Sequence, residues 1–313
     1  MRTRTIGTLT VSEVGIGCNN FGARLDEAGT KAVVDAAVDA GITLFDTADI
    51  YGGTQSEVLL GRALGARRAD VVVATKFGMP VDDERKGAAP DYVRRALEDS
   101  LRRLGTEYVD LYQLHVPDDT VPIGDTLAVL DEQVRQGKVR EIGCSNFTAE
   151  QLRLAAVAAP TGAARFASVQ NQFSLLYREP ERDVLPECEQ LGLAFLPYYP
   201  LASGLLSGKY RAGAAPPEGT RMAGYPKDRV GAWLTDANLA RVGALESFAA
   251  QRGHSVLELA FAWLRSHRRV ASVIAGAMNP DQVRANAAAA AWDLDEPELA
   301  ELDELAPLPP PPG

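Results

Sequence analysis

The sequence predicts an α/β fold, a (β/α)8 TIM barrel, from three observations. Eight short runs rich in β-branched and aromatic residues alternate with helical patterns along the 313 residues. Strict alternation is typical of parallel strands joined by right-handed crossovers. A chain of this length is also common for a barrel that folds as one domain. The expected strands are VGIG (14–17), ITLFD (42–46), VVVATK (71–76), VDLYQLH (109–115), KVREIGCSN (138–146), ASVQN (167–171), LAFLPY (193–198) and VASVIAG (270–276).

Helical patterns lie between these runs, and several of them end in glycine. Gly41, Gly105, Gly137 and Gly192 stand where a left-handed C-cap is expected. The expected helical segments are 30–41, 56–65, 90–105, 121–137, 148–159, 181–192, 236–267 and 279–290. A doubly wound open sheet is the second choice, because no GxGxxG follows the first strand in VGIGCNNFG.

The two ends of the chain and one long connection depart from this rhythm. TRTI and LTVS flank Gly7 and predict an N-terminal β-hairpin that caps the bottom of the barrel. We expect one domain over residues 1–313. Residues 201–229 are rich in glycine, proline and basic residues, which predicts a long functional loop. Residues 306–313, APLPPPPG, predict a disordered proline-rich tail.

Composition narrows the classes of function. The formal net charge is −10, with 32 basic residues scattered among 42 acidic ones, which argues against binding nucleic acid or an anionic membrane. No apolar run is long enough to span a bilayer, and the N-terminus lacks the pattern of a signal peptide. Cys18, Cys144 and Cys188 have no spacing that suggests a zinc site or a disulfide framework. We therefore expect a soluble cytoplasmic protein without a metal.

Chemistry in a barrel of this kind lies at the carboxyl ends of the strands. Asp46, Lys76 and His115 each end an expected strand, and Tyr51 follows Asp46 in LFDTADIYGG. An adjacent ammonium favours a phenolate and lowers a tyrosine pKa, so Lys76 would activate Tyr51. Asp46 would keep the lysine charged, and a neutral His115 would donate a hydrogen bond to a substrate carbonyl oxygen. These residues predict a proton-transfer site that needs no nucleophile or metal.

Taken singly, the same residues have structural explanations. Asp46 would serve as a helix cap, Lys76 as a surface lysine and His115 as a core histidine. His254 and His267, in helical surroundings, are expected to pack, and the apolar neighbours of Cys144 favour packing as well. The functional interpretation depends on the four strand-end residues acting together.

In this order the four residues resemble the Asp–Tyr–Lys–His tetrad of the aldo-keto reductase family. FDTADIYGGTQSEVLLGRAL is similar to the family's signature around its catalytic tyrosine, VREIGCSNF to its carboxamide-binding motif, and YPLASGLLSGKY to its nicotinamide-stacking segment. The resemblance covers residues 5–305. It implies that NADPH, or less often NADH, binds across the barrel mouth below the 201–229 loop, and that the chain reduces aldehydes or ketones to alcohols. The resemblance implies a catalytic tetrad of Asp46, Tyr51, Lys76 and His115, and cofactor contacts from Ser145, Asn146, Gln170, Tyr198, Tyr199, Pro200, Leu201, Ala202, Ser203, Lys209, Gly276, Met278, Gln282 and Asn286.

One departure from the family pattern concerns the 2′-phosphate of NADPH. AGAMNPDQVRAN offers Met278 where a hydroxyl or a cation is common, so Arg284 or Arg221 would have to meet the phosphate, and NADH remains open. Phe77, Met79 and Trp233, with Tyr51, are expected to form apolar walls for a carbonyl substrate of modest size.

Proteins of a similar fold have two other functions that we consider. Potassium-channel β-subunits resemble this chain closely and use the bound nucleotide as a signal, so a regulatory subunit is the main alternative. An isomerase or aldolase acting on a phosphorylated substrate is weaker, because SGLLSGKY stands where a phosphate-binding glycine loop is needed. A monomer is expected, as is usual in the family.

Overall fold

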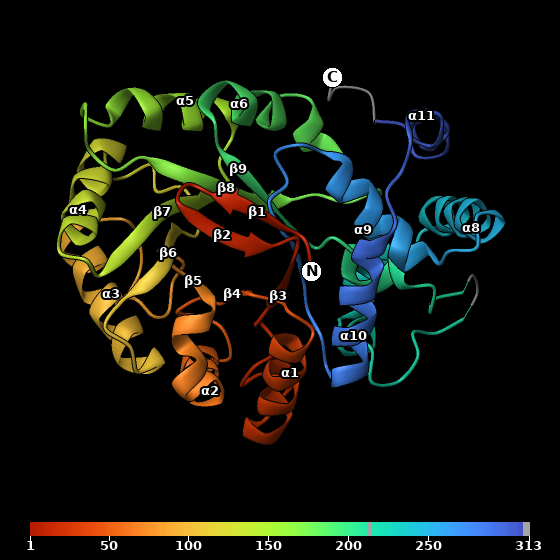
Figure 1. Ribbon diagram of the computed structural model, residues 1–313, viewed down its shortest axis with the longest axis horizontal. Helices are drawn as coiled ribbons and strands as arrows, with labels where there is room; N and C mark the ends of the chain where they lie inside the picture. The colour runs from red at the N-terminus through yellow and green to blue at the C-terminus, as the bar shows by residue number, and fades with distance from the viewer. Residues whose placement is uncertain (212–213, 309–313) are drawn as a thin grey trace.

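Eight parallel strands surround a common axis in the computed structural model, which describes residues 1–211 and 214–308 (Figure 1). The sheet order is β10-β3-β4-β5-β6-β7-β8-β9. Backbone hydrogen bonds of Phe195 with Arg269 (2.7 Å) and Ala271 (3.0 Å) join β9 to the segment before β10. The predicted barrel is therefore confirmed. The strands are β3 (Val14–Gly17), β4 (Leu44–Asp46), β5 (Val72–Phe77), β6 (Val109–Leu114), β7 (Val139–Ser145), β8 (Phe166–Gln172), β9 (Ala194–Tyr198) and β10 (Val273–Ala275).

Helices cover the outside of the barrel in chain order (Figure 1). Those that follow the strands are α1 (Glu27–Asp39), α2 (Gln55–Leu64), α3 (Pro90–Leu104), α4 (Ile123–Arg135), α5 (Ala149–Ala158), α6 (Val184–Leu191), α9 (Val256–Ser266) and α10 (Pro280–Ala288). At Gly105 and Gly192 the backbone has φ of 65° and 74°, the left-handed C-cap that the sequence predicts.

Several boundaries differ from the predicted ones. The expected helix 236–267 is two helices, α8 (Asp236–Gln251) and α9, because Gly253 has φ of 78° and Ser255 starts a new capping box with Glu258. The long loop carries short 3₁₀ turns, Ala202–Ser207 and Met222–Gly224, and runs into α7 (Lys227–Trp233); its residues 212–213 lie outside the described ones. Helix α11 (Glu296–Leu305) was not expected. Ala306, assigned to the tail, is buried, and residues 309–313 are not described.

The predicted hairpin closes one end of the barrel. Strands β1 (Thr3–Ile6) and β2 (Leu9–Ser12) pair antiparallel around the turn at Gly7 (Figure 1). Ile6, Leu9 and Val11 are buried with an apolar cluster inside the barrel, which includes Leu44 and Leu111. Because this cluster fills the hairpin end, polar side chains collect at the other end.

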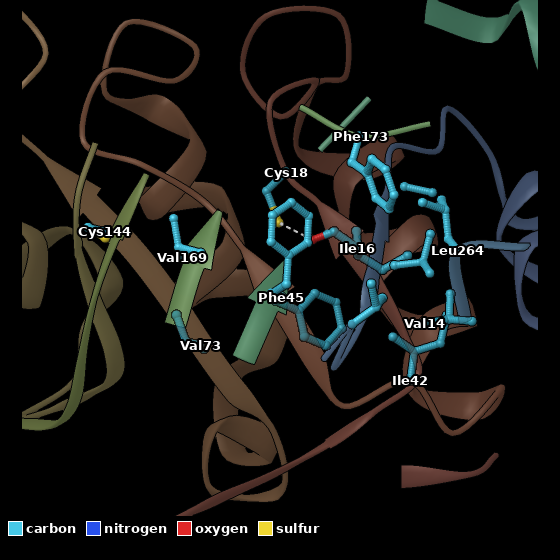
Figure 2. Close-up of a cluster of buried hydrophobic side chains, with 14 of the residues drawn as sticks. Val14, Ile16, Cys18, Ile42, Phe45, Val73, Cys144, Val169, Phe173 and Leu264 are labelled. Carbon is cyan, nitrogen blue, oxygen red and sulfur yellow. Dashed lines mark hydrogen bonds between the residues drawn. The ribbon is translucent and has the colours of Figure 1, made fainter. Parts of the chain in front are cut away.

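A larger apolar cluster lies between the strands and the helices. Figure 2 shows Val14, Ile16 and Phe45 from the strands close to Leu264 of α9. Strand β5 places Val73 in this cluster and Val72 and Ala74 in the inner one, so both of its faces are apolar over this length, as is typical of parallel sheets.

Candidate functional site

The two-residue period of the strands decides which side chains enter the barrel. In β4, Leu44 belongs to the inner cluster and Phe45 to the outer one, so Asp46 points inward. In β5 the inner residues Val72 and Ala74 are followed by Lys76. The same alternation carries β6 through Leu111 and Gln113 to His115. Asp46 and Lys76 are thus the first polar side chains above the apolar filling, and in β6 the polar Gln113 comes before His115.

Lys76 and Asp46 form a buried ion pair. Lys76 Nζ lies 2.6 Å from Asp46 Oδ2 and also donates to the carbonyl oxygen of Thr47 at 2.8 Å. The other carboxylate oxygen, Oδ1, accepts from the side-chain amides of Gln113 (3.2 Å) and Gln170 (2.9 Å). Burial lowers the pKa of Lys76, but Asp46 and Tyr51 raise it by more, so the net shift is upward. The lysine is therefore held as an ammonium, as the sequence predicts.

Tyr51 stands over this ion pair. Lys76 Nζ is 5.1 Å from the centre of the tyrosine ring, and the rings of Tyr51 and His115 meet edge to face with centroids 5.7 Å apart. Burial raises the pKa of Tyr51, and although Lys76 lowers it, the net shift is upward. The expected lowering of the Tyr51 pKa was therefore wrong, because desolvation of a phenolate outweighs the nearby ammonium. Tyr51 stays protonated at neutral pH and can act as an acid.

His115 is neutral in this environment. Burial, followed by the charge of Lys76, lowers its pKa to about 3. Nδ1 has no hydrogen-bond partner within the part of the chain that the structure describes. A neutral imidazole beside a protonated phenol can donate a hydrogen bond to an oxygen without carrying charge.

Gly52 allows the turn that follows Tyr51. Its φ is 58°, and a Cβ at this position would stand 2.3 Å from the carbonyl oxygen of Phe21 in the loop after β3. Only glycine allows both the backbone conformation and the close approach of these two loops.

A large cavity opens above the four residues. Its volume is about 980 Å³, and it extends from Tyr51 and His115 past the β9 end to α10. The expected cofactor residues lie around it with one exception, Ala202, which is fully buried behind the wall. Lys76 also has no surface on the cavity and lies beneath it. The expected residues that line the cavity are Asp46, Tyr51, His115, Ser145, Asn146, Gln170, Tyr198, Tyr199, Pro200, Leu201, Ser203, Lys209, Gly276, Met278, Gln282 and Asn286.

The end of the cavity nearest the tetrad is rich in fixed amides. Asn146 donates from Nδ2 to the carbonyl oxygen of His115 at 2.9 Å, and its Oδ1 accepts from the Tyr198 hydroxyl at 2.8 Å. Ser145 Oγ donates to the Gln170 carbonyl oxygen at 2.7 Å. Of five non-glycine residues with positive φ in the described chain, Asn146, Tyr199 and Ser203 line the cavity. Backbone strain of this kind concentrates at functional sites.

The middle of the cavity is cationic. Lys209, Arg221 and Arg24 line it, and within residues 1–211 and 214–308 no ion pair joins Lys209, Arg221 or Arg24 to a carboxylate. Burial lowers the pKa of Lys209, and the charges of Arg221 and Arg24 lower it further. Ser203 Oγ is buried beside them without a partner among the described residues. Glu218 also lines the cavity but forms no ion pair with these cations among the described residues, so the three cations suit an anionic ligand.

The far end of the cavity is formed by β10 and the start of α10. Asn279 caps the helix by accepting from the Gln282 amide, and Gln282 Oε1 accepts from the Met278 amide at 2.9 Å. Arg284 has no surface on the cavity, since it pairs with Asp281 at 2.8 Å on the exposed face of α10. Asn286 Nδ2 is buried and has no partner in the described chain, although its residue lines the cavity.

Comparisons with known proteins identify this arrangement. The family model described as the aldo/keto reductase family matches residues 13–307. The chain belongs to the aldo/keto reductase family. A probable aldo-keto reductase of Glycine max is 34% identical over 306 residues, which is 95% of this chain and 86% of the soybean protein. A probable voltage-gated potassium channel subunit beta of Oryza sativa subsp. japonica is 34% identical over 287 residues, 89% of this chain and 87% of the rice protein. The solved structure of a glycerol dehydrogenase from Gluconobacter oxydans matches with a TM-score of 0.84 and 31% identity, and covers 99% of this chain and 98% of that one.

Membership in this family explains the cavity as a place for a nicotinamide dinucleotide, and the residues present fit such a group. The cations without carboxylate partners and the buried Ser203 Oγ suit a pyrophosphate, while the unpaired side-chain amide of Asn286 suits a base. No cluster of metal ligands occurs among the described residues of this family member. Among its described helices, none combines the length and the apolar character needed to cross a bilayer.

Sequence reasoning missed part of the cavity wall and misplaced two aromatic residues. Asn19, Asn20 and Arg24 line the cavity from the loop after β3. The two asparagines directly follow GIGC at a strand end, and this position could have indicated a site residue. Phe77 is buried against Tyr112 on the outside of the barrel, because it is out of phase with Lys76. Trp233 packs on Tyr199 with ring centroids 6.3 Å apart and does not line the cavity.

Proposed function

We propose that this chain is an NADP(H)-dependent reductase that converts aldehydes or ketones to alcohols, with Tyr51 as the general acid and base. The observation that carries the proposal is the buried Lys76–Asp46 ion pair beneath Tyr51, with His115 against the phenol ring. A protonated phenol beside a neutral imidazole suits an oxygen that gains a proton, and no residue of the tetrad is placed as a nucleophile.

The bound dinucleotide supplies the hydride in this chemistry. The chain's own residues orient the carbonyl and move the proton. His115 holds the substrate oxygen by a hydrogen bond, and Tyr51 gives it the proton as negative charge develops. Lys76 stabilises the phenolate that remains, so the rising charge on Tyr51 meets an ammonium already in place. In the oxidative direction the same phenolate takes the proton from an alcohol.

Arg221 supports the use of NADPH. Arg284, the other cation considered from the sequence, is paired outside the cavity. Arg221 Nη2 lies 3.1 Å from Asn19 Oδ1 and 3.6 Å from the point where a Cβ on Gly276 would stand, beside the loop that leads to α10. A guanidinium here can reach a phosphate at the adenosine end, whereas Met278 cannot bind one.

The substrate end has apolar walls. Met79 and Val116 line the cavity next to His115 and favour an uncharged organic group on the carbonyl carbon. We therefore propose simple aliphatic and aromatic aldehydes or ketones as the substrate class. The buried free cysteines suit the reducing cytoplasm in which we place this activity, and a monomer stays a prediction.

The test is reduction of nitrobenzaldehyde by the purified protein with NADPH and, separately, NADH, followed by the absorbance of the reduced nicotinamide. We expect oxidation of the dinucleotide, and a loss of about 10²- to 10⁴-fold in kcat in Tyr51→Phe. Dinucleotide binding, measured by fluorescence titration, should be unchanged in this variant. Equal rates in the two proteins would refute Tyr51 as the acid.

A second candidate is a nucleotide-binding regulatory subunit. It is favoured by the rice relative, a probable voltage-gated potassium channel subunit beta, whose 34% identity to this chain equals that of the probable aldo-keto reductase of soybean. If NADPH binds tightly but none of a panel of aldehydes and ketones oxidises it, this candidate is favoured over the reductase.

A further inference from the structure

Asp49 is a buried carboxyl group that the proposed chemistry does not use. It lies two residues before Tyr51 and is only 2% exposed. Its backbone amide donates to the carbonyl oxygen of Lys76 at 3.1 Å, which ties the loop after β4 to the end of β5. Its side chain turns away from the cavity. Oδ2 lies 3.5 Å from the Tyr92 hydroxyl, and Oδ1 has no hydrogen-bond partner within the described residues.

Close to Asp49, the carboxylate of Glu57 already forms an ion pair with the nearby cation, Arg103. Glu57 is fully buried and accepts from Arg103 Nε at 2.6 Å and from Thr75 Oγ1 at 2.6 Å. A second carboxylate here would have no cation of its own. Within the described chain, Asp49 is faced by four titratable or charged groups: Glu57 on α2, Tyr92 and Arg103 on α3, and Tyr112 on β6. Arg85, in the loop before α3, acts on the Tyr92 phenol.

The proton state of Asp49 follows from this packing. Burial raises its pKa to about 7, and the charge of Glu57 contributes, against the lowering effect of Arg103. A protonated carboxyl can donate to the Tyr92 oxygen, whereas a carboxylate in the same place leaves Oδ1 both charged and unpaired. The Tyr112 hydroxyl is also buried without a partner in the described chain, so it does not donate to Asp49 in this packing.

We propose that Asp49 is a positioning residue for Tyr51, whose neutral carboxyl anchors residues 47–51 against β5 and α3 and whose ionisation loosens that segment. Thr47 and Asp49 donate their amides to Ala74 and Lys76 respectively, so this segment holds both the Lys76 ammonium and the tyrosine in place. The role in turnover rests on the proposed function; the anchoring does not.

Hydrogen exchange of the peptide that contains residues 47–51 tests the anchoring without any turnover. If opening exposes Asp49 to water, the opening equilibrium should grow on the order of 50-fold between pH 5 and pH 7.5 and then level off, because the open state loses its proton at a lower pH. After correction for intrinsic exchange, Asp49→Asn should show no such growth. Asp70→Asn, the same change at an exposed position, should behave like the wild type.

Exchange that grows equally in the wild type and in Asp49→Asn would overturn the proposal. If Asp49→Asn does not fold, Tyr92→Phe replaces it, because this change removes the hydroxyl that contacts the carboxyl. Faster exchange of residues 47–51 at pH 5 in Tyr92→Phe supports the anchor, and unchanged exchange overturns it.

A pH profile of aldehyde reduction connects the anchor to Tyr51. Relative to Asp49→Asn, the wild type should lose about tenfold in kcat as the pH rises through 7, since small displacements of a reacting group are costly. The KM for NADPH should stay the same, because Asp49 does not line the cavity. Parallel kcat profiles would overturn the link to Tyr51. Absence of turnover in every variant would refute the reductase proposal, and the exchange result would still decide the anchoring.

Discussion

Replacing Lys76 by methionine should destabilise the protein strongly, because it leaves the Asp46 carboxylate buried without its cation. The ammonium and the carboxylate are 2.6 Å apart, and the two residues are 0% and 3% exposed. Methionine keeps most of the volume of the lysine chain. The change therefore removes the charge and its hydrogen bonds with little effect on packing.

The magnitude follows from the geometry. At an effective dielectric constant of about 20, two unit charges at this distance attract by about 6 kcal/mol, and desolvation of the ions offsets part of this. Loss of one partner of a buried pair typically costs about 3–5 kcal/mol, so Lys76→Met should lose about 4 kcal/mol in the free energy of unfolding.

Urea unfolding at pH 7, followed by circular dichroism, measures this loss, and Asp46→Asn tests its cause. Asparagine Oδ1 can still accept from Gln113 and Gln170, which both donate to Asp46. The double variant Asp46→Asn, Lys76→Met should therefore be about 2 kcal/mol more stable than Lys76→Met alone, because no unpaired charge remains. A double variant no more stable than the single one would refute the explanation by a buried unpaired charge.

Three further predictions concern other parts of the molecule. The Asp49 carboxyl has a pKa of about 7 in the folded protein and an ordinary value of 3.8. Between pH 4 and pH 8 the unfolded chain therefore binds fewer protons than the folded one, so Asp49 lowers the free energy of unfolding by about 4 kcal/mol as the pH rises. Asp49→Asn should abolish this decline. Parallel curves of stability against pH for the two proteins would contradict this. Arg221→Gln should weaken NADPH binding by about 10-fold or more in a fluorescence titration, and NADH binding by less. The control Arg284→Gln changes a surface ion pair and should alter neither affinity. Equal losses of affinity for both dinucleotides would place Arg221 away from the 2′-phosphate. Gly52→Ala should lower the melting temperature and kcat together, since its Cβ would stand 2.3 Å from a backbone oxygen, and a variant with unchanged kcat would show that this loop contact does not position Tyr51.

The sequence was sufficient for the fold because the signals are local and repeated. Most strands are apolar runs that end at a polar residue, and glycine ends several helices, so the order of elements and the hairpin at Gly7 were predictable. The helix break at Gly253 was missed, because one glycine within a long helical pattern does not by itself show that a new cap begins at Ser255. Helix α7 was hidden by the proline and glycine content around it.

The sequence by itself determined which side chains meet at the mouth of the barrel. The period of a strand fixes the face on which Asp46 and Lys76 stand, and parallel strands bring their carboxyl ends together. Only the tertiary structure decided their electrostatics. The upward shift of the Tyr51 pKa, the pairing of Arg284 away from the cavity and the shared pocket of Asp49 and Glu57 depend on burial and on neighbours from other elements. Desolvation is a property of the packed site, and no single segment of the chain carries it.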